Sequence, residues 1–493
     1  MSFKVAFIGA GSIGFTRGLL SDILTVPEFH DIEVAFTDIN PDNLRMVTQL
    51  CQRDIDENGL DIRIHATLNR REAFQGAKYV INCVRIGMLE GFETDVEIPL
   101  KYGVDQCVGD TLCIGGIMYG QRGIQACLEF CRDIREVAAP GCILLNYSNP
   151  NAMITWACNQ YGHVPTYGLC HGVQHGHEQI AQALGRKKED VDIICAGLNH
   201  QTWYISVKTD GVERTGELYE LMKQAEFAKD ENIRLDVMRN FGYYSTESNG
   251  HLSEYLMWYR KRPEDMEKWI NYSSWIQGET AGYLRVCRES RNWFETDFPN
   301  WLKEPARKYV PETRSSEHGS YIIEGLETGR IYRGCFNVMN HGTITNLPAE
   351  CVVEVPCYVD YNGISVPKVG DLPLGCAAIC SASVWVQKLA VEAAVHGDIG
   401  LLYQAAMMDP LTGAVCTPDE IRRMVDEMLV AGREWLPQYD REIPLAEKRL
   451  ESSVLSLRPA KGFRLAAKTV EEMAEEKAKY RALASAAAKE KVE

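Results

Sequence analysis

Residues 4–15 read KVAFIGAGSIGF, a strand-like run that leads into three spaced glycines. The stretch that follows, Phe15 to Thr25, has a helical pattern. A strand, a glycine turn and a helix in this order are the context in which the Gly-x-Gly-x-x-Gly pattern binds a dinucleotide. The pattern predicts a tight turn at Gly9, close approach of a pyrophosphate at Gly11, and close packing of the helix on the strand at Gly14.

A second strand-like run, Glu33 to Thr37, ends in Asp38. A carboxylate at this place can accept hydrogen bonds from the adenosine ribose hydroxyls, and it repels a 2′-phosphate. The sequence therefore favours NAD over NADP as the cofactor. The predicted cofactor contacts are Gly9, Gly11, Ser12, Ile13, Gly14, Asp38, Asn82 and Asn149.

Strand-like and helical segments alternate through the rest of the first half. The runs at Tyr79 to Arg85 and Cys142 to Asn146 are separated by a helical pattern at Gln121 to Val137. This alternation predicts a mainly parallel sheet with helices on both faces. Ligands of such sheets bind beyond the carboxyl ends of the strands, so Asn149 is expected near the nicotinamide.

Two further strand-like runs end in residues that can bind a metal. Thr166 to Leu169 leads into Cys170, and Asp192 to Leu198 leads into Asn199 and His200. A thiolate and an imidazole that converge from neighbouring strand ends would leave coordination positions open for substrate oxygens. A buried cysteine and a separate, hydrogen-bonded histidine satisfy the same pattern.

The second half contains one polar and aromatic segment, Phe241 to His251, between helical patterns. It is interpreted either as a surface loop or as the source of a general base, because tyrosine and glutamate can both act as one. Beyond it, Val352 to Val359 is predicted as a buried strand, and Cys376 to Met408 and Pro418 to Leu436 as helical.

We expect an α/β protein that resembles lactate and malate dehydrogenases. It would have a Rossmann domain at residues 1–195, a mixed α+β catalytic domain at 196–458, and a charged helical tail at 459–493 that is solvated or packs on a partner.

Composition limits the possible partners. The formal net charge of −16 opposes binding to nucleic acid or to an anionic membrane. Hydrophobic residues make up 45% and charged residues 24% of the chain, and the 17 cysteines follow no regular spacing. No secretory signal pattern and no uninterrupted apolar run of about 18 residues is evident. These features favour a soluble, cytoplasmic protein that acts on a small molecule.

Several motifs in order resemble those of glycoside hydrolase family four, the NAD- and manganese-dependent glycosidases. The resemblance covers roughly residues 3 to 440. The motifs are Gly9-Ala10-Gly11-Ser12, Asp110-Thr111 with Gly115-Gly116-Ile117, Asn146-Tyr147-Ser148-Asn149-Pro150, Cys170-His171, Ala196-Gly197-Leu198-Asn199-His200, and Asn346-Leu347-Pro348 with Val353-Glu354-Val355-Pro356.

The resemblance implies a glycosidase that works by a redox route instead of by paired carboxylates. NAD oxidises C3 of the sugar, a base removes the C2 proton, the aglycone is eliminated, water adds, and the hydride returns. Cys170 and His200 are then the ligands of Mn²⁺ or another divalent cation.

By family position, Tyr244 is the predicted base, with Glu247 as the alternative, and His171 is the predicted acid. Asp110 is expected to orient the sugar or relay protons, and Asn149 to hold sugar hydroxyls. Arg85 is expected either to bind a substrate carboxylate or to form a surface ion pair. A homodimer or homotetramer is implied as well.

Within the family, Phe241 to Ser248 is most similar to the corresponding segment of the melibiose-type α-galactosidases, and His171 after the metal cysteine is typical of members that cleave unphosphorylated glycosides. Gly172 and His175 depart from the galactosidase pattern. An α-galactoside or an α-uronide is therefore the expected substrate, with glucosides possible. The alternatives are an NAD-dependent 2-hydroxyacid dehydrogenase, which needs no cysteine and histidine pair, and an NAD-sensing regulator.

Overall fold

A computed structural model describes residues 3–270, 275–291, 293–452 and 455–490. The described residues form a twelve-stranded mixed sheet. One side of it is parallel and contains, in spatial order, β3 (Ile64–Thr67), β2 (Glu33–Thr37), β1 (Lys4–Ile8), β4 (Tyr79–Asn82), β5 (Ile143–Asn146) and β6 (Thr166–Gly168). This half confirms the predicted Rossmann arrangement.

The sheet continues with antiparallel strands from residues 191–213 and 332–365. After β6 come β10 (Tyr332–Met339), β11 (Val352–Asp360), β7 (Val191–Leu198), β8 (Gln201–Thr209) and β9 (Val212–Glu213), and β12 (Gly363–Ser365) pairs with β11. Strands from both predicted domains therefore share one sheet. The division near residue 195 stays a prediction.

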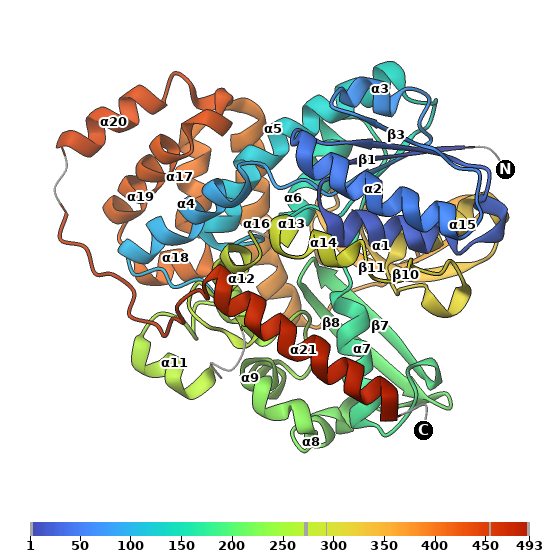
Figure 1. The fold of residues 1–493 in the computed structure, drawn as a ribbon. Coiled ribbons are helices and arrows are strands. Elements are labelled where there is room, and N and C mark those ends of the chain that lie inside the picture. The colour runs from blue at the N-terminus through green and yellow to red at the C-terminus, as the bar shows by residue number, and fades with distance from the viewer. Residues whose placement is uncertain (1–2, 271–274, 292, 453–454, 491–493) are drawn as a thin grey trace.

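Helices cover the parallel strands and fill the space beside them (Figure 1). Those of the first half are α1 (Ile13–Leu24), α2 (Pro41–Glu57), α3 (Arg70–Phe74), α4 (Met88–Lys101), α5 (Cys113–Val137) and α6 (Asn151–Gln160). Those near the middle are α7 (Gly172–Ala183), α8 (Leu218–Met222), α9 (Asn232–Phe241), α10 (Asn249–Tyr255), α11 (Pro263–Trp269), α12 (Gly282–Glu289), α13 (Trp293–Thr296), α14 (Phe298–Trp301) and α15 (His318–Thr328).

The last helices gather at one end of the molecule, except for the C-terminal one (Figure 1). They are α16 (Leu374–His396), α17 (Ile399–Met408), α18 (Pro410–Val415), α19 (Pro418–Ala431), α20 (Ile443–Ser452) and α21 (Val470–Glu490). The single helical stretch expected from Cys376 to Met408 is two helices. It breaks at Gly397, whose φ of +65° is typical of a glycine that ends a helix.

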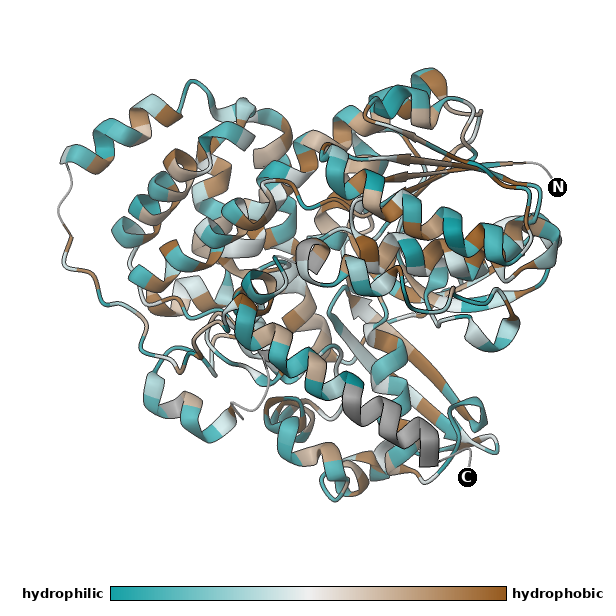
Figure 2. Ribbon diagram, in the orientation of Figure 1, coloured by the Kyte–Doolittle hydropathy of each residue, from teal (hydrophilic) through white to brown (hydrophobic). Residues whose placement is uncertain are grey.

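Strand residues in the parallel half alternate between two cores. Val5 and Phe7 of β1 belong to the large central cluster, whereas Ala6 and Ile8 face a smaller cluster that also includes Leu144 of β5. Both faces of these strands are therefore buried, as is usual for a parallel sheet with helices on each side. The strands accordingly form a hydrophobic band under more polar helices (Figure 2).

One described helix, α16, is long and apolar enough to span a membrane by length and composition. Half of its most apolar window is buried inside the protein, against the central cluster that includes Cys376, Val384 and Ala390. The core helix of a folded domain has the same properties, so α16 needs no membrane to account for its composition.

Candidate active site

The glycine turn after β1 forms a cradle at the carboxyl end of the parallel strands. Gly9 has a φ of +79°, and a Cβ atom there would lie 2.8 Å from the carbonyl carbon of Cys83. The N–H of Gly11 donates to Oδ2 of Asp38 at 2.8 Å, and the N–H of Asn40 donates to Oδ1 at 2.8 Å. The acid at the end of β2 therefore fixes the shape of the turn and retains oxygen lone pairs for a ribose.

The N-terminus of α1 suits a phosphate. Ser12 is the N-cap residue and its side chain makes no capping hydrogen bond, so the first N–H groups of this twelve-residue helix are left to a ligand. Ile13, the first residue of the helix, is half-buried. The residues present thus fit a dinucleotide.

Two expectations for the cofactor loop need correction. Gly14 does not pack the helix on the strand: it is exposed, and a Cβ atom there would meet nothing within 4 Å. It is the second residue of α1, in the first turn of the helix. Asn82 is fully buried and its Nδ2 donates to Oδ1 of Asn146 at 2.9 Å, so its side chain links β4 to β5.

Three potential metal ligands converge beyond β6. Nε2 of His200 lies 3.2 Å from Sγ of Cys170 and 3.3 Å from Oε2 of Glu247, and the sulfur and this oxygen are 3.5 Å apart. Among the described residues this is the group of histidine, cysteine and acidic side chains close enough to share one ion. The predicted pairing of Cys170 with His200 is present in the structure, and Glu247 joins it.

Local backbone structure brings these ligands together. His200 occupies the two-residue turn between β7 and β8 with a φ of +60°, a left-handed conformation that is uncommon for a residue with a side chain. Gly172, two residues after Cys170, lies so close to the Glu247 carboxylate that a Cβ atom at 172 would collide with it. The glycine that departs from the galactosidase pattern therefore makes room for the third ligand.

The charges of the cluster suit a cation. Burial by itself raises the pKa of Glu247, but the imidazoles of His200, His251 and His171 outweigh it and bring this pKa to about 2. Burial and the Glu247 carboxylate raise the pKa of the Cys170 thiol well above its usual value. A divalent ion would stabilise the thiolate beside this carboxylate, and a thiolate, an imidazole and a carboxylate are accepted ligands of such ions.

A hydrogen-bonded chain connects the cluster to Asp110 and Asn149. The Thr111 hydroxyl lies 2.8 Å from Oδ1 of Asp110 and 3.0 Å from Nδ1 of His200, and Nδ2 of Asn149 donates to Oδ2 of Asp110 at 3.0 Å. An ionised carboxylate only accepts, so the single hydroxyl proton of Thr111 goes to Asp110. Nδ1 of His200 must then carry a proton, which leaves the lone pair of Nε2 free to bind a cation.

His171 lies at the edge of the cluster and faces solvent. Its side chain is 58% exposed, and its Nδ1 lies 3.2 Å from Oε1 of Glu317. The hydrogen bond to Glu317 raises the pKa of His171 to about 9, against a smaller opposing effect of burial. The imidazole therefore holds a proton at neutral pH and can exchange it with water.

Tyr244 does not lie at the cluster. Its ring is buried beside Tyr204, with ring centroids 6.1 Å apart, under the Arg234 guanidinium, and its hydroxyl donates to Oε1 of Gln179 at 2.9 Å. The backbone pairing of this segment with β8, where Tyr204 N–H donates to Tyr244 C=O, turns the tyrosine into a separate core cluster. This position contradicts its predicted role as the base.

Tyr255, at the end of α10, is a tyrosine that the sequence reasoning missed. It is 1% exposed, and its hydroxyl has no hydrogen-bond partner among the described residues. Burial raises its pKa well above the usual value, and the charges of Glu254, Asp110 and Glu247 act in the same direction. These acids, together with an edge contact to the ring of His251, place Tyr255 in the wall of the site.

Arg85 forms no ion pair among the described residues, so the predicted surface pair is wrong. Its guanidinium lies over the rings of Phe92, Tyr119 and Tyr283, at 4.6, 5.5 and 5.4 Å from the ring centroids. Nη2 donates to the Tyr283 hydroxyl at 3.2 Å, whereas Nη1 is buried without a partner. The expectation that it binds a substrate group stays a prediction.

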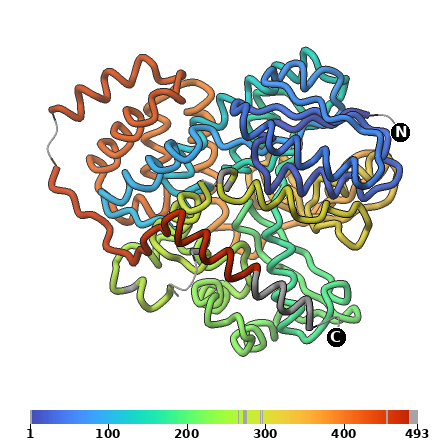
Figure 3. The backbone as a smooth tube through the Cα atoms, in the orientation of Figure 1, coloured from blue at the N-terminus to red at the C-terminus, as the bar shows by residue number. Residues whose placement is uncertain are grey.

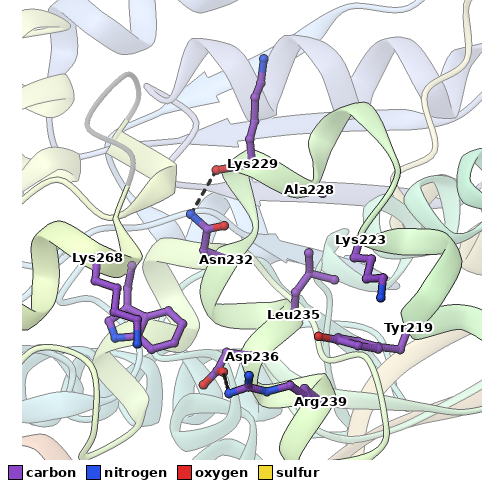
Figure 4. Close-up of a pocket in the computed structure, with 10 residues that line it drawn as sticks. Tyr219, Lys223, Ala228, Lys229, Asn232, Leu235, Asp236, Arg239 and Lys268 are labelled. Atoms are coloured by element: carbon purple, nitrogen blue, oxygen red, sulfur yellow. Dashed lines mark hydrogen bonds and ion pairs between the residues drawn. The ribbon is translucent and has the colours of Figure 1, made fainter.

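A cavity of about 530 Å³ lies away from the cluster, beside α8, α9 and α11 (Figure 4). Basic side chains surround it, and Arg239 is paired there with Asp236 (Figure 4). None of the predicted site residues lines this cavity. It is therefore separate from the site assembled at the strand ends.

Comparison with known proteins gives family matches over most of the chain. The model "Family 4 glycosyl hydrolase" matches residues 4–186, and the model of the C-terminal domain of the same family matches residues 195–412. An α-galactosidase of Rhizobium meliloti is 54% identical over 98% of this chain and 99% of its own length. An α-galactosidase of Bacillus subtilis is 35% identical over 88% of this chain and 99% of its own length.

Solved structures show the same fold. The 6-phospho-β-glucosidase of Thermotoga maritima, solved with manganese, NAD⁺ and glucose 6-phosphate, superposes with a TM-score of 0.72 at 24% identity. The match covers 88% of this chain and 99% of that one. A 6-phospho-α-glucosidase from gut microorganisms, in complex with NAD and glucose 6-phosphate, gives a TM-score of 0.74 at 23% identity and covers 89% and 99%.

Proposed function

The chain belongs to the family 4 glycosyl hydrolases, and we propose that it is an NAD- and divalent-metal-dependent α-galactosidase that cleaves unphosphorylated α-galactosides. One observation carries the proposal. Cys170, His200 and Glu247 lie close enough together to share one cation, and Cys170 follows β6 at the same sheet edge as the dinucleotide turn. The choice of galactose is supported by the two α-galactosidase relatives, above all the one at 54% identity.

Cys170, His200 and Glu247 would hold the cation, and the turn from Gly9 to Gly14 with Asp38 would hold NAD. When bound, NAD supplies a hydride acceptor and donor for the sugar, and the cation supplies a Lewis acid that favours loss of the neighbouring carbon-bound proton. The side chains of the protein would position NAD and the cation beside the sugar, and they would take up and donate the protons of the reaction.

Tyr255 is the base in this proposal. Its hydroxyl is buried in the wall of the site, and the positive charge of a bound cation would offset its raised pKa and favour the phenolate form that a base requires. Asp110 and Asn149 accept and donate hydrogen bonds at the adjacent wall and would orient sugar hydroxyls. Thr111 fixes the His200 ring by its hydrogen bond to Nδ1.

His171 is the acid that assists departure of the aglycone. It directly follows Cys170, faces solvent, and is held by Glu317, so a proton given to the leaving group can be replaced from water. Arg85 would use its partnerless Nη1 on a substrate oxygen at the opposite wall, where the aromatic rings hold the guanidinium in place.

A panel of aryl glycosides tests the proposal. The purified protein is assayed with NAD, Mn²⁺ and a thiol reductant on α-galactoside, α-glucoside, α-glucuronide and α-galacturonide. We expect turnover of the α-galactoside, no net NADH, inhibition by a chelator and recovery with Mn²⁺. Preference for a uronide would overturn the choice of galactose, and steady NADH release from a 2-hydroxyacid would overturn the glycosidase itself.

We also propose a cytoplasmic setting and assembly into a homodimer or homotetramer. None of the seventeen cysteines, all of which lie in the described residues, forms a disulfide, which suits a reducing compartment. Light scattering of the purified protein measures the assembly.

A further inference from the structure

The chain after α20 returns across the molecule to the active-site side. Residues 455–469 have no helix or strand and run along the surface before α21 (Figures 1 and 3). We call residues 455–469 the strap. Its large side chains stay partly in solvent, since Phe463 is 43% and Leu465 is 40% exposed. Leu457 packs partly buried against the central cluster, so apolar burial holds the start of the strap, and other contacts must hold residues 460–465.

Backbone hydrogen bonds fasten the strap to two segments. The N–H of Ala460 donates to the Leu100 carbonyl at 2.8 Å, at the end of α4. The Phe463 carbonyl accepts from the N–H of Thr280 at 2.9 Å, and the N–H of Leu465 donates to Oε1 of Glu279 at 3.0 Å. Residues 279 and 280 directly precede α12, so the strap holds the start of that helix.

Gly462 is the point of closest approach. A Cβ atom at this position would collide with Oδ2 of Asp105 and Oγ1 of Thr280. These two side chains are themselves hydrogen-bonded at 2.8 Å, and Asp105 is also paired with the buried Arg260. The strap thus covers a polar junction that only glycine lets it reach.

The same junction supports the active-site wall. Ala281 N–H donates to the Gln106 carbonyl at 2.7 Å and Tyr283 N–H to the Cys107 carbonyl at 3.1 Å. The loop from 105 to 110 then leads to Asp110. Two residues into α12, Tyr283 bonds Arg85.

The other side of this loop is held by a carboxylate of α10. Glu254 accepts from the N–H groups of Cys107, Val108 and Gly109 at 2.8, 2.9 and 3.0 Å. Tyr255 is its neighbour in sequence. The loop therefore lies between the helix that carries the proposed base and the segment that the strap holds.

We propose that the strap is a positioning element of the active site. It fixes residues 279–283 against the loop 105–110, and so sets the places of Asp110 and of Tyr283 with Arg85. The family models end at residue 412, ahead of the strap, and the 35% identical relative matches over 99% of its length with 88% of this chain. The strap therefore lies outside the residues that the family models match, whereas the match to the 54% identical relative covers 98% of this chain. The role of Asp110 in catalysis rests on the proposed function. The effect of the strap on the position of Asp110 does not.

The test uses the full chain with Gly462→Val, and with Leu465→Pro, which removes the N–H that reaches Glu279. Gly216→Val is the matched control, because a Cβ atom at Gly216 meets nothing within 4 Å. Amide hydrogen exchange is measured without NAD or metal, and kcat, KM and NAD affinity are measured with them. Exchange gives a result even if the chain cleaves no galactoside.

We expect exchange at residues 105–110 and 279–283 to become at least 10-fold faster in both strap variants, with residues 4–40 and the control unchanged. The kcat should fall about 10-fold while NAD affinity stays the same. Unchanged exchange in the loop would overturn the proposal. Equally faster exchange throughout the chain would overturn it too, because the strap would then be a general stabiliser.

Discussion

The Thr111 hydroxyl lies 3.0 Å from Nδ1 of His200 and at the same time 2.8 Å from the Asp110 carboxylate. This contact determines which nitrogen of the imidazole carries the proton, and it leaves Nε2 directed at Cys170 and Glu247. Thr111 does not contact Nε2, the atom that would bind the cation, but its hydrogen bond to Nδ1 leaves Nε2 unprotonated.

Thr111→Val should weaken cation binding by 10- to 100-fold, the usual cost of losing a partner behind a metal-binding histidine. Calorimetric titration with Mn²⁺ measures it. Thr111→Ser keeps the hydroxyl and should bind within about threefold of the parent. Equal affinities of the valine and serine variants would show that the hydroxyl does not direct the histidine.

Glu247→Gln separates a ligand from a base. If Glu247 is a metal ligand, the loss of its negative charge should raise the Mn²⁺ concentration for half-maximal activity by about 10-fold or more. Saturating Mn²⁺ should then restore most of kcat. Glu317→Gln, which affects His171 outside the cluster, should leave the Mn²⁺ requirement unchanged. A kcat that stays lost at saturating Mn²⁺ would instead point to Glu247 as the base.

Tyr255→Phe should lower kcat by about 100-fold or more, the scale of general base catalysis, with NAD and Mn²⁺ binding intact. The companion variant Tyr244→Phe loses only the hydrogen bond to Gln179. It should cost about 1 kcal/mol in the free energy of unfolding and leave kcat within a few-fold. Deuterium uptake from D₂O at C2 of the sugar follows the step itself. The opposite ranking of the two variants would return the role to Tyr244.

Asp409 makes stability depend on pH. Burial raises the pKa of this fully buried carboxyl to about 7, against 3.8 for an exposed aspartate. The folded chain therefore keeps a proton that the unfolded chain releases between these values, so the free energy of unfolding falls as pH rises from about 4 to about 7 and then levels off.

Asp409→Asn should remove this slope and make the protein more stable than the parent at pH 8, by at most about 4 kcal/mol on the scale of 1.36 kcal/mol per pKa unit. Urea unfolding at pH 5 and pH 8 measures both chains. Parallel pH profiles of the two would contradict the assignment.

The parts of the fold that short stretches of sequence encode could be predicted. The turn from Gly9 to Gly11 follows from local backbone demands. Cys170 and His200 do meet, but β7 runs antiparallel to β6, and their ends lie close only because the register through β10 and β11 aligns Gly168 with Gly197. The predicted packing role of Gly14 was wrong because this residue is exposed and a Cβ atom there would meet nothing within 4 Å.

The identity of the proposed base could not be predicted from the sequence. Tyr244 lies in the polar and aromatic segment and Tyr255 only four residues beyond its end, and the sequence pattern does not tell which ring faces the cluster. Pairing of residue 244 with Tyr204 of β8, a contact over forty positions in the chain, turns Tyr244 away. The C-terminal tail could also be predicted only in part. The helix α21 forms as expected, but the strap is held to the rest of the chain by backbone hydrogen bonds, which composition does not reveal.

The ligands of the cluster come from distant parts of one continuous sheet. Cys170 follows β6 in the parallel half, whereas His200 lies between β7 and β8, which reach that half only through β10 and β11. A chain whose outer strands had not yet docked would offer one ligand and not the others. An ion held by all three side chains would therefore bind only a chain in which this sheet is complete, and its binding would stabilise that folded chain over partly folded ones.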